Sequence, residues 1–113
     1  MRLTAEQFAT FARYATAHGA TASVAMTAAF STVLGRYGDR DHFLLTLTTM
    51  TRFPFAAAVA RLVGDFTGTS ALEVDVRGQH TFSELLRTIG ARLFDDMDHA
   101  AVSGVEVARM LAR

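Results

Sequence analysis

The chain has 113 residues, of which 50% are hydrophobic and 19% are charged, and its formal net charge is zero. This length supports one domain with one modest core, and the composition is that of a globular protein and not of a disordered one. Zero net charge gives no reason to expect nucleic acid or an anionic membrane as a partner. The absence of cysteine excludes disulfides, zinc–thiolate sites and thiol catalysis.

Two helices are predicted in the first third of the chain. The first runs from Thr4 to His18, because Thr4 can act as the N-cap and Gln7 completes a capping box three residues later. Gly19 follows as a natural terminator. The second helix covers residues 21–36, and its many alanines predict close packing against another element. A turn is expected at residues 38–41.

Two strands are predicted in the middle of the chain, at residues 42–49 and 66–76. The first strand has two alternating rows, which are Phe43, Leu45 and Leu47 on one face and Leu44, Thr46 and Thr48 on the other. The segment Thr51–Pro54 interrupts it, and residues 56–63 are expected to form a short helix. With so long a connection, the two strands can still lie in one sheet with helices on one side.

Two more helices complete the predicted order. Thr81 and Glu84 form a second capping box, which starts a helix that ends near Met97, after a loop at residues 78–80. Ser103 and Glu106 form a third, which starts a last helix to Arg113. The order is α-α-β-(α)-β-α-α, an α/β (α+β) fold with helices packed on a small sheet. Because two strands alone make a poor sheet, further strands are expected from elsewhere or the chain is a piece of something larger.

The start of the second strand carries the first candidate site. Asp65 and Thr67 flank an aromatic residue where a loop enters the strand, and a carboxylate there can orient a ligand or act as a base. The plainer alternative is that Asp65 accepts backbone hydrogen bonds in a turn. The row of Thr46 and Thr48 either lines a polar channel or faces solvent. Arg52 is interpreted as a structural anchor that ties its loop to a carboxylate.

An acidic cluster near the end of the fourth helix is the second candidate. Asp95, Asp96, Asp98 and His99 can suggest a metal site, but such a run is more typical of a solvated surface, and Asp95 and His99 can pair along the helix. The four histidines, which are His18, His42, His80 and His99, show no metal-ligand spacing, so no metal is expected. With no apolar signal region and no apolar run that approaches a membrane span, a cytoplasmic location is expected.

Three blocks, in the same order, resemble the heterocyclization domains of nonribosomal peptide synthetases, which are relatives of condensation domains. Residues 43–59 read FLLTLTTMTRFPFAAAV, and the family has a strand similar to FLLNLTLFNRLPLHPDV. Residues 64–75 read GDFTGTSALEVD, which resembles GDFTSLLLLEVD. Residues 96–113 read DMDHAAVSGVEVARMLAR, which is similar to DLDHRAYSGVEVLRELAR. GDFT and SGVEV are nearly verbatim, so the resemblance is specific and covers essentially the whole chain.

The resemblance implies a fold similar to chloramphenicol acetyltransferase, in which two lobes flank a tunnel. Phosphopantetheine arms of two carrier proteins enter that tunnel as substrate carriers, and no directly bound cofactor is expected. The family joins an acyl group to carrier-bound Cys, Ser or Thr, and then cyclises the side chain with loss of water to a thiazoline or oxazoline. The implied tunnel-lining or positioning residues of this chain are Asp65, Thr67, Thr46 and Thr48.

The chain also departs from the family. It lacks the DxxxxD motif of the N-terminal lobe, and it stops before the PVVFTS-like strand and the TPQV-like segment that carry the family's Thr and Asp for cyclodehydration. Thr46 stands where the family has Asn, residues 68–70 replace Ser-Leu-Leu, and residues 56–58 replace His-Pro-Asp. We therefore expect a segment of the C-terminal lobe, spanning residues 1–113, that is inactive alone and holds no catalytic residue.

Peptidyl carrier proteins and the remaining parts of a synthetase are the expected partners, and exposed apolar faces with free strand edges also allow a homodimer. The alternative is a stand-alone binding or assembly module, derived from a condensation-type domain, that contacts a carrier protein or a synthetase. A third reading is a segment of a plain condensation-type acyltransferase. An HHxxxDG motif would decide for it, and this chain has none.

Overall fold

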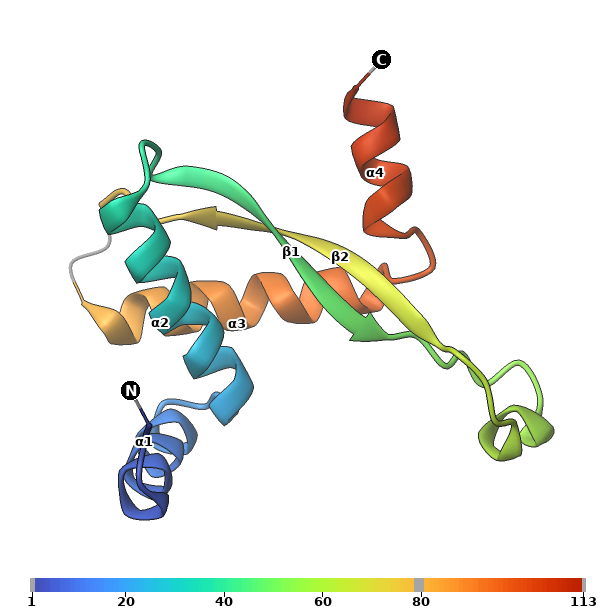
Figure 1. The fold of residues 1–113 in the computed structure, drawn as a ribbon, viewed down its shortest axis with the longest axis horizontal. Helices are drawn as coiled ribbons and strands as arrows, with labels where there is room; N and C mark the ends of the chain where they lie inside the picture. Colours follow the sequence, from blue (N-terminus) through green and yellow to red (C-terminus); the bar gives the residue numbers. More distant parts are fainter. Residues whose placement is uncertain (1, 79–80, 113) are drawn as a thin grey trace.

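The computed structural model describes residues 2–78 and 81–112. Its elements, in chain order, are α1 (Ala5–Ala17), α2 (Ala22–Tyr37), β1 (His42–Met50), the 3-10 helix η1 (Ala57–Arg61), β2 (Thr67–Asp75), α3 (Phe82–Asp98) and α4 (Gly104–Leu111) (Figure 1). The predicted order and the mixed fold class are confirmed, with ends that differ by one or two residues. The predictions for residues 79 and 80 and for the end of the last helix at Arg113 lie outside the described residues.

All three predicted capping boxes are present. At the start of α1, Gln7 N–H donates to Thr4 Oγ1 over 3.2 Å, and Thr4 N–H donates to Gln7 Oε1 over 2.8 Å. Thr81 and Ser103 cap α3 and α4 in the same reciprocal way. Each box satisfies N–H groups that have no partner inside the helix, which is why these N-termini could be predicted from the local sequence.

The predicted short helix after β1 is a 3-10 helix of five residues, Ala57–Arg61, and not an α-helix. Its N-cap, Ala56, has no side chain that can accept a hydrogen bond from the first turn. A segment so short forms too few hydrogen bonds to offset the unfavourable nucleation of an α-helix, so it adopts the tighter 3-10 turn. Its fixed position therefore depends on contacts with other residues, which are described below.

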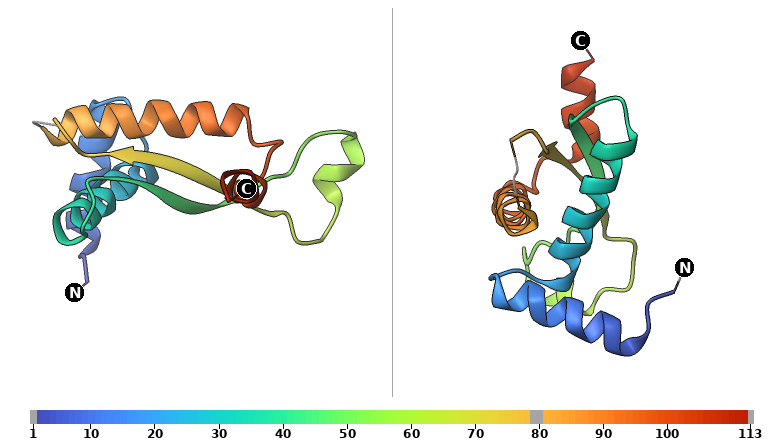
Figure 2. Two further views of the ribbon diagram at one scale, coloured as in Figure 1. Left: turned by 90° about the horizontal axis from the view of Figure 1, so that it is seen from above. Right: turned by 90° about the vertical axis from the view of Figure 1, so that its left-hand side faces the viewer.

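The two strands form one antiparallel sheet, with His42 opposite Asp75 at one end and Met50 opposite Thr67 at the other. The row of Phe43, Leu45 and Leu47 packs against the core, and the predicted alternation of the two rows is confirmed. Thr46 and Thr48 are exposed on the opposite face. Figure 2 shows α3 running along one face of the sheet, with α1 and α2 at one end and the loop that contains η1 at the other.

The core is small and lies between β2, α3 and the first two helices. Its largest fully buried side chains are Leu72 and Val74 of β2 and Leu86 and Ile89 of α3. Ala15, Ala25 and Ala28 are also fully buried, and their small side chains let α1 and α2 approach this cluster closely. The prediction that the alanines of the second helix serve close packing is thereby confirmed.

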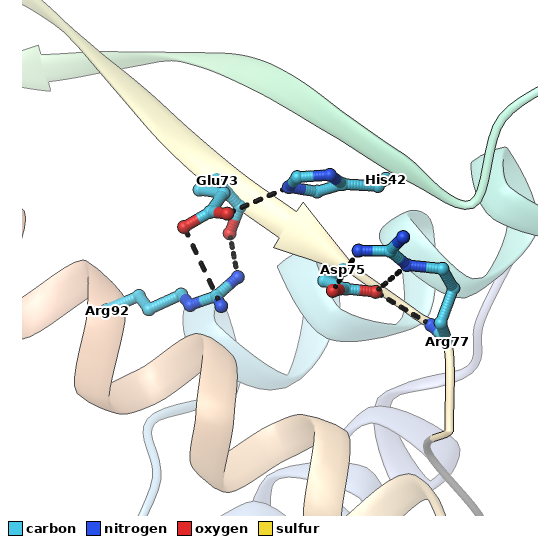
Figure 3. A network of polar contacts seen from close by, with 5 residues as sticks. All are labelled: His42, Glu73, Asp75, Arg77 and Arg92. Carbon is cyan, nitrogen blue, oxygen red and sulfur yellow. Dashed lines mark hydrogen bonds and ion pairs between the residues drawn. The ribbon is translucent and has the colours of Figure 1, made fainter.

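Polar contacts hold α3 and both strands together at the end of the sheet where His42 lies opposite Asp75 (Figure 3). Glu73 of β2 lies between His42 of β1, at 2.8 Å, and Arg92 of α3, at 3.6 Å. Arg92 also donates to the backbone carbonyl of Glu73 over 2.9 Å. Just beyond, Asp75 pairs with Arg77 at 2.7 Å. The contacts between Arg92 and Glu73 fix α3 to the outer edge of β2.

The far end of the molecule is open. Residues 51–66 project as a loop beyond the C-terminal end of α3 (Figure 2). The radius of gyration is 16.1 Å, whereas about 13 Å is usual for a compact domain of this length. α4 contacts β2 through its first turn, where a side chain on Gly104 would lie 3.2 Å from the backbone of Thr69 and Ser70. Within the described residues, no helix is long and apolar enough to cross a membrane.

Candidate functional site

A cleft of about 390 Å³ lies where the projecting loop enters β2. The lining residues come from the end of β1 and the start of β2: Thr48, Thr49, Met50, Arg52, Gly64, Asp65, Phe66 and Thr67. The structure therefore brings together three of the four residues predicted to line a tunnel. The fourth, Thr46, lies farther along β1 and is not part of the cleft.

Asp65 shapes the turn that leads into β2. Its Oδ1 accepts a hydrogen bond from Thr67 N–H over 2.8 Å, which closes a turn of the Asx type. Hydrogen bonds from the Thr67 side chain and then from its backbone lower the pKa of Asp65 below its ordinary value. The carboxylate is thus ionised at neutral pH and can accept hydrogen bonds, but it is poorly suited to donate a proton as a general acid.

Arg52 fixes the projecting loop from inside. Its Nη1 donates to the carbonyl of Ala60 over 3.0 Å, and its Nη2 donates to that of Leu62 over 3.2 Å. Its guanidinium also lies over the ring of Phe66, 4.1 Å from the ring centre. The interpretation of Arg52 as tied to a carboxylate was wrong about the partner. In the structure the partners are backbone carbonyls at the end of η1 and of Leu62 just after it.

The face of the sheet that bears Thr48 has two further residues, Met50 and Thr69, that are not among the predicted site residues. The register places Thr48 opposite Thr69 and Met50 opposite Thr67, so these four side chains share one face at the far end of the sheet. The alternation of β2 alone puts Thr67 and Thr69 on one face. Met50, which is 81% exposed, follows Thr48 by two residues, so the alternation of β1 puts it on this face as well, just past the predicted end of the strand at residue 49.

The acidic cluster at the end of α3 does not form a metal site. His99 Nδ1 lies 2.9 Å from the backbone carbonyl of Asp95 and not from its carboxylate, so the expected side-chain pair is not formed. Among residues 2–78 and 81–112, no group of three or more His, Asp or Glu side chains is arranged to hold a metal ion. Asp96 is the member of the cluster that turns toward the sheet, where Ser70 Oγ donates to its Oδ2 over 3.4 Å.

The cleft of about 390 Å³ is called the GDFT cleft below, after its lining residues 64–67. It offers hydroxyl groups, one ionised carboxylate and the apolar surfaces of Met50 and Phe66. The lining residues contain no histidine or lysine to activate a hydroxyl as a nucleophile. Such a surface can bind and orient a chain that carries polar groups on an apolar stem.

The model of the condensation-domain family matches residues 1–112. The pyochelin synthetase PchF of Pseudomonas aeruginosa is 43% identical over 96 residues, which cover 85% of this chain and 5% of that protein. The phenyloxazoline synthase MbtB of Mycobacterium tuberculosis is 37% identical over 105 residues, which cover 93% of this chain and 7% of that protein. The chain thus spans less than a tenth of the length of these relatives.

Solved structures contain the same fold. The nonribosomal peptide synthetase FmoA3 is 36% identical with a TM-score of 0.86, over all of this chain and 13% of that one. The cyclization-docking bidomain of EpoB from Sorangium cellulosum is 32% identical with a TM-score of 0.85, over 98% of this chain and 22% of that one. The condensation domain of MokA, at 24% identity and a TM-score of 0.84, shares the fold.

Proposed function

The chain belongs to the condensation-domain family, and we propose that its 113 residues form part of the C-terminal lobe of a heterocyclization domain of a nonribosomal peptide synthetase. One observation carries this proposal. The GDFT block, which distinguishes the resemblance to heterocyclization domains, folds into a single cleft with Thr48 and Arg52 of the preceding block. The relatives support the same type, since they include a protein named as a phenyloxazoline synthase and a cyclization-docking bidomain.

The proposed reaction has two stages. The amine of a carrier-bound Cys, Ser or Thr attacks the upstream thioester, which forms an amide and releases the thiol of the donor arm. The side-chain thiol or hydroxyl then attacks the new amide carbonyl, and the former carbonyl oxygen leaves as water after protonation. In this scheme the reacting acid and base lie outside this chain. Thr48, Asp65 and Thr67 position a substrate arm by accepting and donating hydrogen bonds along it.

The partners in this proposal are peptidyl carrier proteins, whose phosphopantetheine arms carry the substrates, and the rest of the synthetase, all in the cytoplasm. An arm of this kind has amide groups on a flexible apolar stem, which suits the mixture of hydroxyls with Met50 and Phe66 in the cleft. Thr46 is exposed on the same face of the sheet and is proposed to line the approach to the cleft. No observation favours the stand-alone assembly module.

The test is a chimera of a heterocyclization domain such as that of PchF. Its segment that aligns with this chain is replaced by residues 1–113, and the domain is supplied with loaded donor and acceptor carriers. Mass spectrometry of the acceptor carrier separates the amide from the ring, because ring formation removes one water. The control chimera carries the aligned segment of the MokA condensation domain, which shares the fold at 24% identity.

We expect the chimera with this chain to form the amide and then the ring, and the control chimera to stop at the amide. A chimera that is folded and forms the amide but never loses water would overturn the heterocyclization assignment. It would leave a condensation-type role in its place.

A further inference from the structure

The hydrogen bonds between the two strands show which backbone groups point away from the sheet. Val76 N–H donates to the carbonyl of Asp41 over 2.9 Å, and Thr51 N–H donates to the carbonyl of Phe66 over 2.8 Å. Both pairs continue the register at the two ends of the ladder. Since hydrogen-bonded and non-hydrogen-bonded pairs alternate along an antiparallel ladder, the even-numbered residues of β1 turn their N–H and C=O groups outward, away from β2. These residues are His42, Leu44, Thr46, Thr48 and Met50.

The outer edge of β1 is open. In the described part of the chain, the outward N–H and C=O groups of these five residues have no hydrogen-bond partner. A row of alternating donors and acceptors at the spacing of a strand is matched by the backbone of another extended segment. The chemistry of this edge therefore fits an added strand.

The outer edge of β2 is covered by α3 and α4. Arg92 of α3 donates to the backbone carbonyl of Glu73 over 2.9 Å. A β-carbon on Gly104, at the start of α4, would lie 3.2 Å from the carbonyl oxygen of Thr69 and 3.3 Å from the backbone nitrogen of Ala71. A strand could pair with this edge only if both helices moved away.

The burial of the core-facing side chains differs between the two strands in the same sense. Leu72 and Val74 of β2 are fully buried. Leu45 and Phe43, which lie directly opposite them on β1, are only half-buried, although they pack against the same core. Apolar cover is therefore complete over β2 and missing beside β1, which is the side on which the backbone edge is open.

We infer that an extended strand from the rest of the domain pairs with the outer edge of β1, and that no strand pairs with the outer edge of β2. The added strand carries apolar side chains on the face of Leu45 and polar side chains on the face of Thr46, because the two faces of a sheet continue from strand to strand. The occupant belongs to the same domain, since this chain spans only 22% of the EpoB bidomain whose fold contains it. The inference rests on the part of the proposed function that makes this chain one segment of a larger domain, and not on the reaction.

The test compares hydrogen exchange in the free 113-residue chain with exchange in the chimera described above, in which this chain replaces the aligned segment of the PchF domain. Mass spectrometry with fragmentation to single residues reads each amide. The amides of Leu44, Thr46 and Thr48 point outward from β1. Those of Leu45 and Leu47 bond to β2, so they report in both proteins that the ladder is intact.

In the free chain, we expect the outward amides of β1 to exchange at least about tenfold faster than the inward ones. In the chimera they should slow at least about tenfold, while the Thr69 amide on the outer edge of β2 changes less than about threefold. Outward amides of β1 that are already slow in the free chain, or that stay fast in a chimera with slow inward amides, would overturn the inference. A gain of protection at Thr69 instead of β1 would do the same.

Two matched proline variants test the same edge. Thr48 and Thr69 lie directly opposite each other, and each turns its N–H outward from its own strand. Proline removes that N–H and blocks strand pairing on its side. In the chimera, Thr48→Pro should lower the melting temperature by at least about 5 °C more than Thr69→Pro does, whereas in the free chain the two shifts should be similar. Equal shifts in the chimera would contradict the inference, and the exchange experiment decides if neither variant folds.

These readouts are independent of ring formation. A folded chimera that stops at the amide contradicts the heterocyclization assignment and leaves the exchange result standing. A chimera that forms the ring while the edge of β1 stays unprotected overturns this inference alone.

Discussion

Asp75 shows how one carboxylate couples stability to pH. Its Oδ1 accepts from the side chain of Arg77 over 2.9 Å and from its backbone N–H over 3.0 Å. These hydrogen bonds, the side-chain bond first, hold the pKa of Asp75 well below its ordinary value of 3.8. A depressed pKa in the folded state means that the contribution to stability is present above the unfolded pKa and is lost as pH falls below it.

We therefore expect the native chain to lose thermal stability as the pH falls below about 4, and Asp75→Asn to flatten part of that loss. The measurement is the melting temperature from pH 7 to pH 3. Asp39→Asn, in the turn before β1, is the matched control and should keep the native pH dependence. If D75N and D39N followed the same curve, the Asp75–Arg77 contact would not be the cause.

Two glycines near the GDFT cleft differ in what they require. A β-carbon on Gly68 would lie 2.7 Å from two side-chain atoms of Thr51 and 3.1 Å from Thr49 Oγ1. A β-carbon on Gly64 would meet only Phe66, at 3.8 Å, which is an ordinary contact. Close approach across the two strands therefore requires glycine at position 68 but not at position 64.

Gly68→Ala should lower the free energy of unfolding by about 1–3 kcal/mol, because the added methyl group overpacks the strand pair. Gly64→Ala should change it by less than about 0.5 kcal/mol. Urea unfolding of both variants measures the difference. A G64A variant as destabilised as G68A would show that the GDFT glycine has a structural requirement that the contacts do not reveal.

The projecting loop is the element that depends most on one side chain. η1 has no cap of its own, and Arg52 supplies hydrogen bonds to the carbonyls at its end. Lysine at position 52 keeps the charge but has neither the planar fork that reaches two carbonyls nor the flat face that stacks on Phe66. Arg52→Lys should therefore raise hydrogen exchange at residues 57–62 at least about tenfold and leave α3 unchanged.

Arg61→Lys is the matched control, because Arg61 is exposed at the end of the same helix. It should leave exchange in residues 57–62 as in the native chain. Slow exchange of these residues in R52K would mean that the loop is held by its own backbone and not by Arg52.

Elements defined by neighbours in sequence could be predicted, and those defined by distant partners could not. The Thr4, Thr81 and Ser103 caps depend on residues three positions away, so the sequence predicts them directly. The carbonyl partners of Arg52 come together only when the loop closes. From sequence alone, a carboxylate is the partner more commonly expected for an arginine side chain. The grouping of Thr48 with Asp65 and Thr67 agrees with their selection as candidates, but their role toward a substrate stays a prediction.

At the scale of the whole molecule, apolar surface is left uncovered. Met26, Phe30, Val33 and Tyr37 form a stripe at helical spacing along α2, each between 47% and 83% exposed. α4 buries none of its residues. Both outer edges of the two-stranded sheet are also free of strand partners in the described part of the chain. Surfaces of this kind seek partners. No finding supports a second copy of this chain as that partner, and we propose that the rest of the lobe covers them.

The most direct test of this account mixes the chain with the complementary part of a heterocyclization domain, from which the aligned segment has been deleted. Light scattering on a sizing column gives the mass of each species over a range of concentrations. We expect the two parts to form a one-to-one complex, and Phe30→Ser in the α2 stripe to weaken it. A chain that stays a concentration-independent monomer and does not bind the complementary part would contradict its assignment to a larger two-lobed domain.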